Sequence, residues 1–156
     1  MMTRNLIPVF LCVLFAGCAA SPSGQEPEIK TEAMKQEKRA AMQEARLAIT
    51  EQDWNRAIES YRTVLELDPH DAVAVNNLAL LLREKGRFRE AATLLQEGID
   101  YSPKTPDLHY NLAVIAELYL LDLELALTHY RRFRELTEKE GQLVAGWIAD
   151  LERRLE

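Results

Sequence analysis

Residues 72–105 read AVAVNNLALLLREKGRFREAATLLQEGIDYSPKT. Apolar side chains recur at three- and four-residue steps on both sides of Gly86, as expected of two amphipathic helices joined by a short turn. Gly86 can take the left-handed conformation that ends a helix, and Asp71 stands where the first helix needs an N-cap. The stretch therefore predicts a helical hairpin.

The same pattern recurs at a fixed offset along the chain. Residues of matching kind stand 34 apart: Trp54 and Phe88, Ala57 and Ala91, Pro69 and Pro103, Asn77 and Asn111, Leu78 and Leu112, with Ala45, Ala79 and Ala113 as a triple. Such a period indicates one supersecondary unit repeated along the chain. We expect Ala79 and Ala91 where helices approach most closely. Larger side chains then fill the space between hairpins: Leu78, Phe88 and Leu95.

The pattern resembles the tetratricopeptide repeat. Residues 72–105 match its consensus at all seven characteristic places: Leu78, Ala79, Phe88, Ala91, Leu95, Gly98 and Pro103. The flanking copies are expected at about 38–71, where only Glu44 is out of character, and at about 106–140. The resemblance implies an all-α domain over 32–156, a right-handed superhelix of about three hairpins.

Two turns depart from the pattern. Ala126, Tyr130 and Phe133 follow their counterparts in the preceding copy by 35 residues rather than 34. One residue is therefore inserted, and we expect an irregular turn around Leu120 to Glu124. In the first copy Gln52 replaces the glycine, so we expect that turn to be strained or differently shaped.

The C-terminal residues predict a capping helix over about 141–156. Its apolar residues recur at three- and four-residue steps: Leu143, Val144, Trp147, Ile148, Leu151 and Leu155. Such a helix has one apolar face, which would cover the open end of the third hairpin, as stacked repeats require.

The N-terminus predicts an export signal over residues 1–17. Arg4 precedes an apolar stretch from Leu6 to Ala16, which is too short to span a bilayer. The residues Phe15-Ala16-Gly17-Cys18 resemble the lipobox of bacterial lipoproteins, which implies cleavage before Cys18 and a lipid on its thiol. The alternative is an ordinary leader cut near Ala20.

The mature N-terminus is expected to carry a lipid anchor and a tether. Residues 18–31 are rich in Ser, Pro, Gly and Glu, which predicts a flexible linker. By resemblance to lipoproteins, Ala19 after the lipidated cysteine implies sorting to the outer membrane, facing the periplasm.

Composition and motifs argue against several function classes. The formal net charge is -6, which disfavours nucleic-acid binding. His70, His109 and His129 have no ligands at metal-binding spacing, and no nucleophile motif or phosphate-binding loop is present. We expect no enzyme, no cofactor and no small-molecule substrate.

The resemblance implies a protein-binding groove on the concave face, formed by the first helix of each repeat. The expected lining residues are Met42, Arg46, Val73, Asn76, Asn77, Leu80, Tyr110, Asn111 and Val114. Asn77 and Asn111 either hold a peptide backbone or bridge adjacent helices. Family members that clamp a C-terminal carboxylate have cationic residues where this chain has Met42, Asp107 and Asn111, which disfavours such a clamp. A peptide or helical segment bound partly by apolar contact is favoured.

These features lead to one main hypothesis and two alternatives. The main one is a membrane-anchored adaptor in envelope assembly, with pilus or secretin machinery suggested by resemblance. The first alternative is a structural subunit that oligomerises through its convex face or cap. The second is an accessory to peptidoglycan-remodelling enzymes.

Overall fold

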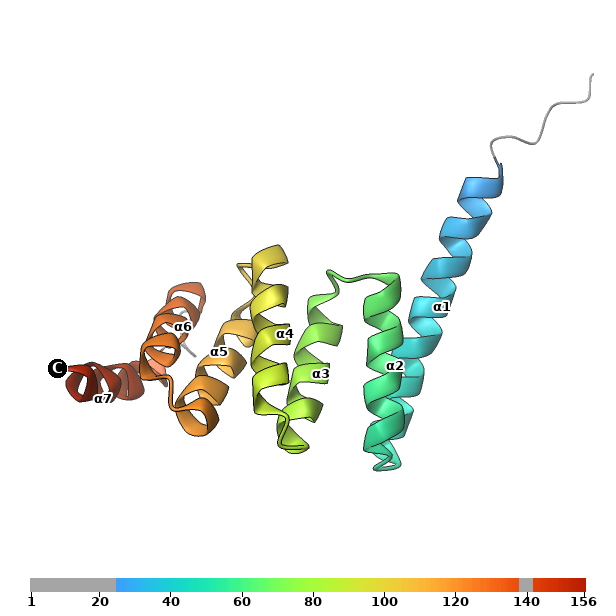
Figure 1. Ribbon diagram of the computed structural model, residues 1–156. Coiled ribbons are helices and arrows are strands. Elements are labelled where there is room, and N and C mark those ends of the chain that lie inside the picture. Colours follow the sequence, from blue (N-terminus) through green and yellow to red (C-terminus); the bar gives the residue numbers. More distant parts are fainter. Residues whose placement is uncertain (1–24, 138–141) are drawn as a thin grey trace, which may run out of the picture.

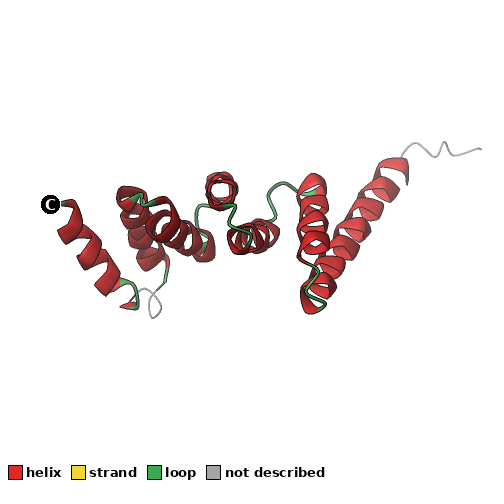
Figure 2. Ribbon diagram, turned by 60° about the horizontal axis from the view of Figure 1, so that its bottom comes forward, coloured by secondary structure: helices red, strands yellow, loops and turns green. Residues whose placement is uncertain are grey.

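The computed structural model describes residues 25–137 and 142–156, and every regular element in these ranges is helical (Figures 1 and 2). The elements are α1 (Gln25–Thr50), α2 (Trp54–Leu67), α3 (Ala72–Glu84), α4 (Phe88–Tyr101), α5 (Pro106–Ile115), the π-helical η1 (Ala116–Leu120), α6 (Leu123–Leu136) and α7 (Ala145–Leu155). They succeed one another along an elongated stack, from α1 at one end to α7 at the other (Figure 1). The expected architecture, helical hairpins followed by a capping helix, is confirmed.

The start of the folded part needs a correction. Helix α1 begins at Gln25, so residues 25–31, expected to belong to a flexible tether, are helical. Pro27 is tolerated there because N–H groups in a first helical turn have no intrahelical partner. Further along, Lys35 donates a hydrogen bond of 2.7 Å to Glu32, one turn earlier.

Some sequence expectations lie outside the described residues. They are the export signal over 1–17, the lipidation of Cys18, the linker up to residue 24, the end of the third repeat and the first residue of the cap.

Small side chains lie where the helices approach most closely. Ala79 of α3 and Ala91 of α4 are fully buried, as expected. A Cβ atom on Gly98 of α4 would lie 2.6 Å from a methyl carbon of Val75 on α3, closer than packed atoms allow. Any larger residue at position 98 would therefore force the Val75 side chain to shift. Leu78 and Leu95 are buried between helices, while Phe88 is only half-buried and stacks on Tyr119.

Two apolar clusters hold the stack together. The first runs from Ala45 on α1 to Ile115 on α5 and includes the buried faces of α2, α3 and α4. The second joins α5, η1, α6 and the cap through Ala113, Ala116, Ala126, Leu127, Tyr130, Phe133, Val144, Ile148 and Leu151. The capping helix thus buries one apolar face on the last hairpin, as solenoid ends require.

Aspartates cap three of the helices. The side chains of Asp53, Asp71 and Asp122 accept hydrogen bonds of 3.0–3.1 Å from the backbone N–H three residues later. Asp71 has a second role, because Lys38 of α1 donates to it at 3.1 Å and to Asp68 at 2.7 Å. This contact ties α1 to the turn between α2 and α3.

The inserted residue of the third copy lies in η1 rather than in the expected turn after Leu120. A π-helical turn holds one residue more than an α-helical turn, so η1 absorbs the insertion. Leu121, with φ 57°, ends the helix, and the Asp122 N–H bonds the Ala116 carbonyl at 2.9 Å. Asp122 then caps α6 normally, so the third hairpin closes despite the extra residue.

The turn at Gln52 is strained but keeps the glycine shape. Gln52 has φ 60° and Gly86 has φ 72°. In both turns a backbone N–H bonds the carbonyl five residues back: Asp53 to Ala48 at 2.8 Å, and Arg87 to Leu82 at 2.9 Å. The strain expected from the sequence is confirmed, and a different shape is not found.

A buried histidine pair joins α5 to α6 and was not expected. The Nδ1 atoms of His109 and His129 are 2.8 Å apart, and Nε2 of His109 lies 3.1 Å from the Pro103 carbonyl oxygen. Because a carbonyl only accepts, His109 donates through Nε2, and its Nδ1 accepts the proton of His129. Burial lowers both pKa values, and burial together with the charge of His109 lowers the pKa of His129 to about 4.

Replacing Gln52 by glycine should raise the free energy of unfolding by about 0.5–1 kcal/mol, because relief of left-handed strain exceeds the added chain entropy. Urea unfolding measures the change. The reciprocal variant Gly86→Gln should lower stability by a similar amount. A Gln52→Gly variant less stable than the wild type would contradict this account of the turn.

Stability should fall as the pH drops below about 6.5. The unfolded chain protonates both histidines there, whereas the folded chain keeps His129 neutral down to about pH 4. The stabilisation that the neutral histidine pair contributes is complete above the pKa of histidine in the unfolded chain. It is lost as the pH falls toward the pKa of His129 in the folded chain. The loss from His129 alone is about 2 kcal/mol between pH 7.5 and 5.

Denaturant unfolding of His129→Gln across this range should show a shallower pH dependence. His70→Gln is the matched control, because His70 is exposed in the turn between α2 and α3. Equal pH slopes for the wild type and His129→Gln would exclude the histidine pair as the cause.

Candidate functional site

The expected groove residues of α3 form one stripe along that helix. Val73, Asn76, Asn77 and Leu80 stand at steps of three, one and three, which places them on one side of a helix. Val73 is 55% exposed, and the other three are half-buried. These side chains are therefore accessible to a ligand, and three of them are also partly packed against the protein.

The α5 residues continue this stripe. Tyr110, Asn111 and Val114 share one side of α5 in the same way. The side-chain amide of Asn111 donates a hydrogen bond of 2.7 Å to the amide oxygen of Asn76, so the stripes of α3 and α5 adjoin directly.

The α1 residues connect to this surface through Tyr61. Burial raises the pKa of Tyr61, while the charge of Arg46 and a side-chain hydrogen bond with Asn77 oppose that shift. Tyr61 of α2 thus lies between Arg46 of α1 and Asn77 of α3. Arg46 is exposed, and Met42 is half-buried against the core.

We call the nine expected groove residues the first-helix face, because α1, α3 and α5 are the first helices of the three hairpins. Its residues are Met42, Arg46, Val73, Asn76, Asn77, Leu80, Tyr110, Asn111 and Val114.

The amides on this face bond within the scaffold. Asn77 is engaged with Tyr61, and Asn111, which is only 8% exposed, with Asn76. Of the two interpretations, the structure favours bridging between helices over capture of a peptide backbone. The side chains left to meet a ligand are mainly apolar, with Arg46 as the charged exception.

A pocket of about 270 Å³ opens at the α7 end of the first-helix face. We call it the aromatic pocket; it is lined by Asp107, Tyr110, Phe133, Leu143, Val144 and Trp147. The Tyr110 ring lies 5.2 Å from that of Phe133 and 6.4 Å from that of Trp147, centroid to centroid. Of its three rings, only that of Tyr110 was expected at a site, because the rings come from three different helices.

A partly buried hydrogen bond lies beside the aromatic pocket. The Tyr130 ring lies 5.5 Å from that of Trp147, and its hydroxyl donates to a carboxylate oxygen of Glu117 at 3.0 Å. Burial, followed by the interaction with Glu117, raises the pKa of Tyr130, so the phenol stays protonated and remains a donor. Arg154 of α7 lies 3.7 Å from the other oxygen of Glu117, which connects the cap to η1.

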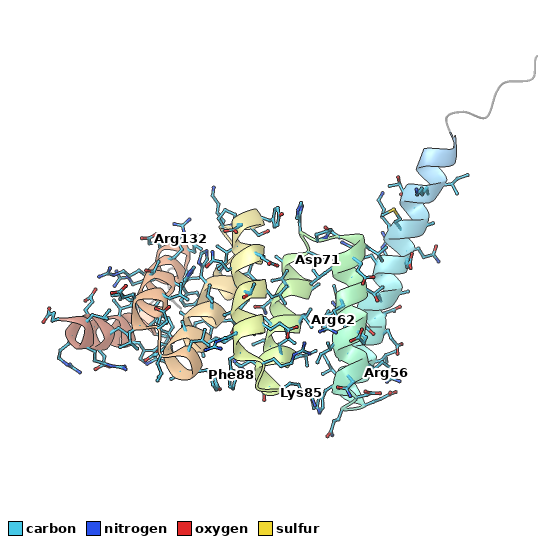
Figure 3. All side chains as sticks on the ribbon, in the orientation of Figure 1. Arg56, Arg62, Asp71, Lys85, Phe88 and Arg132 are labelled. Carbon is cyan, nitrogen blue, oxygen red and sulfur yellow. The ribbon has the colours of Figure 1, made fainter. Side chains whose placement is uncertain are left out.

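A larger hollow of about 560 Å³ lies between α2 and α4, away from the expected groove. Its lining combines leucines with polar residues: Leu65, Leu78, Leu82 and Leu94 with Arg62, Glu66, Glu90, Thr93 and Glu97. Arg62 reaches from α2 toward the neighbouring hairpin (Figure 3) and contacts Glu90 of α4 at 3.3 Å. This ion pair bridges the hollow, which sequence patterns did not indicate.

Metal-binding clusters are absent from the described part of the chain. No group of three or more His, Cys, Asp or Glu residues in it is arranged to hold a metal ion. The two histidines that do meet are buried and bonded to each other. Among helices of residues 25–137 and 142–156, none is both long and apolar enough to cross a bilayer.

Comparison with known sequences supports the repeat assignment. Residues 48–118 match the family model described as tetratricopeptide repeat. The Drosophila melanogaster protein O-mannosyl-transferase Tmtc2 is 36% identical over 59 residues, which are 38% of this chain and 6% of that protein. Because the chain spans so little of this relative, the match extends to a shared repeat and not to the relative's activity.

Solved structures share the fold. PcrH, in complex with the chaperone-binding region of PopD, superposes with a TM-score of 0.67 at 17% identity, covering 76% of this chain and 92% of that one. The TPR2B domain of yeast Sti1, in complex with pHsp70, gives 0.64 at 22% identity, covering 74% and 93%. Residues 48–118 therefore carry tetratricopeptide repeats, and the described part of the chain has the tetratricopeptide-repeat fold.

Proposed function

We propose that this chain is a non-enzymatic scaffold that holds a segment of a partner protein against the first-helix face. The observation that carries the proposal is the continuity of that face, in which Asn111 joins α5 to α3 and Tyr61 lies between α3 and α1. A rigid, pre-formed surface lowers the entropy cost of binding. Two proteins that share the fold are solved as complexes: PcrH with the chaperone-binding region of PopD, and the TPR2B domain of Sti1 with pHsp70.

The bound segment is best described as extended or helical, with apolar anchors. Accessible side chains on the face include Val73, Leu80, Tyr110 and Val114, while the amides between them are already bonded. Apolar and aromatic side chains contribute most of the affinity in such interfaces. Where a carboxylate clamp needs cations, the chain carries Met42, Asp107 and Asn111, so a terminal carboxylate is not the target.

For location we propose a lipid on Cys18, an outer-membrane position facing the periplasm and a role in assembly of an envelope machine of the pilus or secretin type. The support is the sequence: an apolar stretch from Leu6, the residues Ala16-Gly17-Cys18, and Ala19 after them. Two or three acyl chains bind a bilayer durably, because each buried CH₂ contributes about 0.8 kcal/mol.

A second candidate function is self-assembly through the cap. Leu143 is 74% exposed, Trp147 44% and Leu155 41%, an apolar surface that an identical copy could cover. Light scattering separates the two: a stable oligomer dissociated by Trp147→Glu supports self-assembly, and a monomer supports the scaffold.

Introducing charge on the first-helix face should abolish partner retention. Val73→Glu combined with Arg46→Glu changes two exposed side chains, so the fold should persist while an acidic pair replaces apolar and basic contacts. Membrane extracts are passed over wild-type and variant protein, and retained proteins are quantified by mass spectrometry.

A protein retained by the wild type should fall at least tenfold with the double variant. Gln96→Glu, an exposed change on α4, is the matched control and should retain it fully. Undiminished retention by the double variant would show that the partner binds elsewhere.

The anchor is tested through the two cysteines of the chain, Cys12 and Cys18. Cys18→Ser should abolish incorporation of radioactive palmitate and release the protein from membranes, because the acylated thiol is lost. Cys12→Ser is the control and should leave both unchanged. Palmitate incorporation that survives in Cys18→Ser would refute the assignment of the lipid.

A further inference from the structure

We propose that the aromatic pocket binds the guanidinium group of an arginine side chain carried by the partner segment. The inference deepens the proposed function, since Tyr110 belongs both to the pocket and to the first-helix face. It identifies one residue of the partner segment as an arginine and places that residue at the α7 end of the face.

The rings around the pocket provide the attraction. Faces of Tyr, Phe and Trp rings carry negative potential, and a cation within about 6 Å of a ring centroid is stabilised by it, with Trp the strongest partner. Three such rings line this pocket, and their centroids lie 5.2 Å (Tyr110 to Phe133) and 6.4 Å (Tyr110 to Trp147) apart. A planar guanidinium can stack on an aromatic face while its N–H groups point outward.

Charge selects a cation over an apolar anchor. Asp107 is the charged residue in the lining, and its carboxylate has no ion-pair or hydrogen-bond partner among residues 25–137 and 142–156. A carboxylate can receive a guanidinium in a two-pronged hydrogen bond. The pocket thus combines aromatic rings with an available anion.

Two arginines of the neighbouring helices are engaged with acidic partners outside this pocket. Arg131 of α6 is engaged with Glu152 at 2.6 Å, and Arg154 of α7 contacts Glu117 and Asp150 at 3.7 and 3.6 Å. Neither lines the pocket. An incoming arginine therefore meets no like charge at the lining.

Size and exposure fit a single side chain. The volume of about 270 Å³ is below the range of about 300–1,000 Å³ that holds drug-sized ligands. Val144 is buried, whereas Leu143 is 74% exposed and Trp147 44% exposed. The pocket thus has a closed apolar floor at Val144 and an accessible opening beside Leu143 and Trp147.

Trp147 reports occupancy directly. The chain has two tryptophans, so Trp54→Phe leaves Trp147 as the fluorophore. Circular dichroism first confirms that this background folds like the wild type. The full-length chain in the Trp54→Phe background is titrated with N-acetyl-arginine amide, and with N-acetyl-citrulline amide as the neutral isostere. Saturable quenching by the arginine probe is expected, with the citrulline probe at least tenfold weaker.

Asp107→Asn should weaken the arginine probe at least fivefold while keeping the shape of the pocket. Asp100→Asn, an exposed carboxamide change on α4, is the matched control and should bind like the background. Equal binding of the arginine and citrulline probes would overturn the inference. Unchanged arginine binding by Asp107→Asn would overturn it as well.

The outcomes also separate this inference from the proposed function. Loss of the partner with Val73→Glu and Arg46→Glu, without arginine binding at the pocket, would refute the inference alone. Specific arginine binding, with partner retention untouched by that double variant, would refute the first-helix face as the docking surface.

Discussion

The structure depends on how closely its helices approach one another. At Gly98 the backbone of α4 lies so near α3 that a single added carbon would meet Val75 at 2.6 Å. Ala79 and Ala91, which are small and have no exposed surface, are buried in the same core cluster. Tight contacts between neighbouring helices leave little freedom in their relative rotation. The sides of α3 and α5 that face away from the core are therefore presented together, which makes a continuous docking surface possible.

The third hairpin shows how this constraint survives a change in chain length. An inserted residue would rotate the end of α5 relative to α6 if it stayed in an α-helix. The π-helical η1 takes up the extra residue, and Leu121 then ends the helix in the same left-handed conformation that Gln52 and Gly86 adopt in the first two hairpins. Downstream of it, Asp122 caps α6 in the same manner as Asp53 and Asp71 cap theirs. The pocket between α5, α6 and α7 depends on α6 packing normally against α5 despite the inserted residue.

Much of the fold could be predicted because a repeated structural unit produces residues of the same kind at a fixed spacing in the sequence. A helical hairpin is determined by residues close together in the chain, and it can be recognised from Gly86, Asp71 and the regularly spaced alanines. The one-residue insertion before Ala126 could also be recognised in the sequence. The sequence did not show whether an irregular turn or a π-helix accommodates it. The meeting of His109 with His129, and of Tyr110 with Trp147, depends on how separate helices are rotated, which a residue pattern does not specify. The hydrogen-bond partners of Asn77 and Asn111 lie on other helices, so the spacing of residues along one helix does not specify them either.

The central claim is that a partner segment lies along the first-helix face. Photocrosslinking in intact cells tests it most directly, with a benzoylphenylalanine placed in turn at Val73 and at Val114, and at Gln96 on α4 as the reference position. The account predicts crosslinks from both valine positions to one short segment of the same protein, and none from position 96. Crosslinks to a partner from position 96, with none from either valine position, would contradict it.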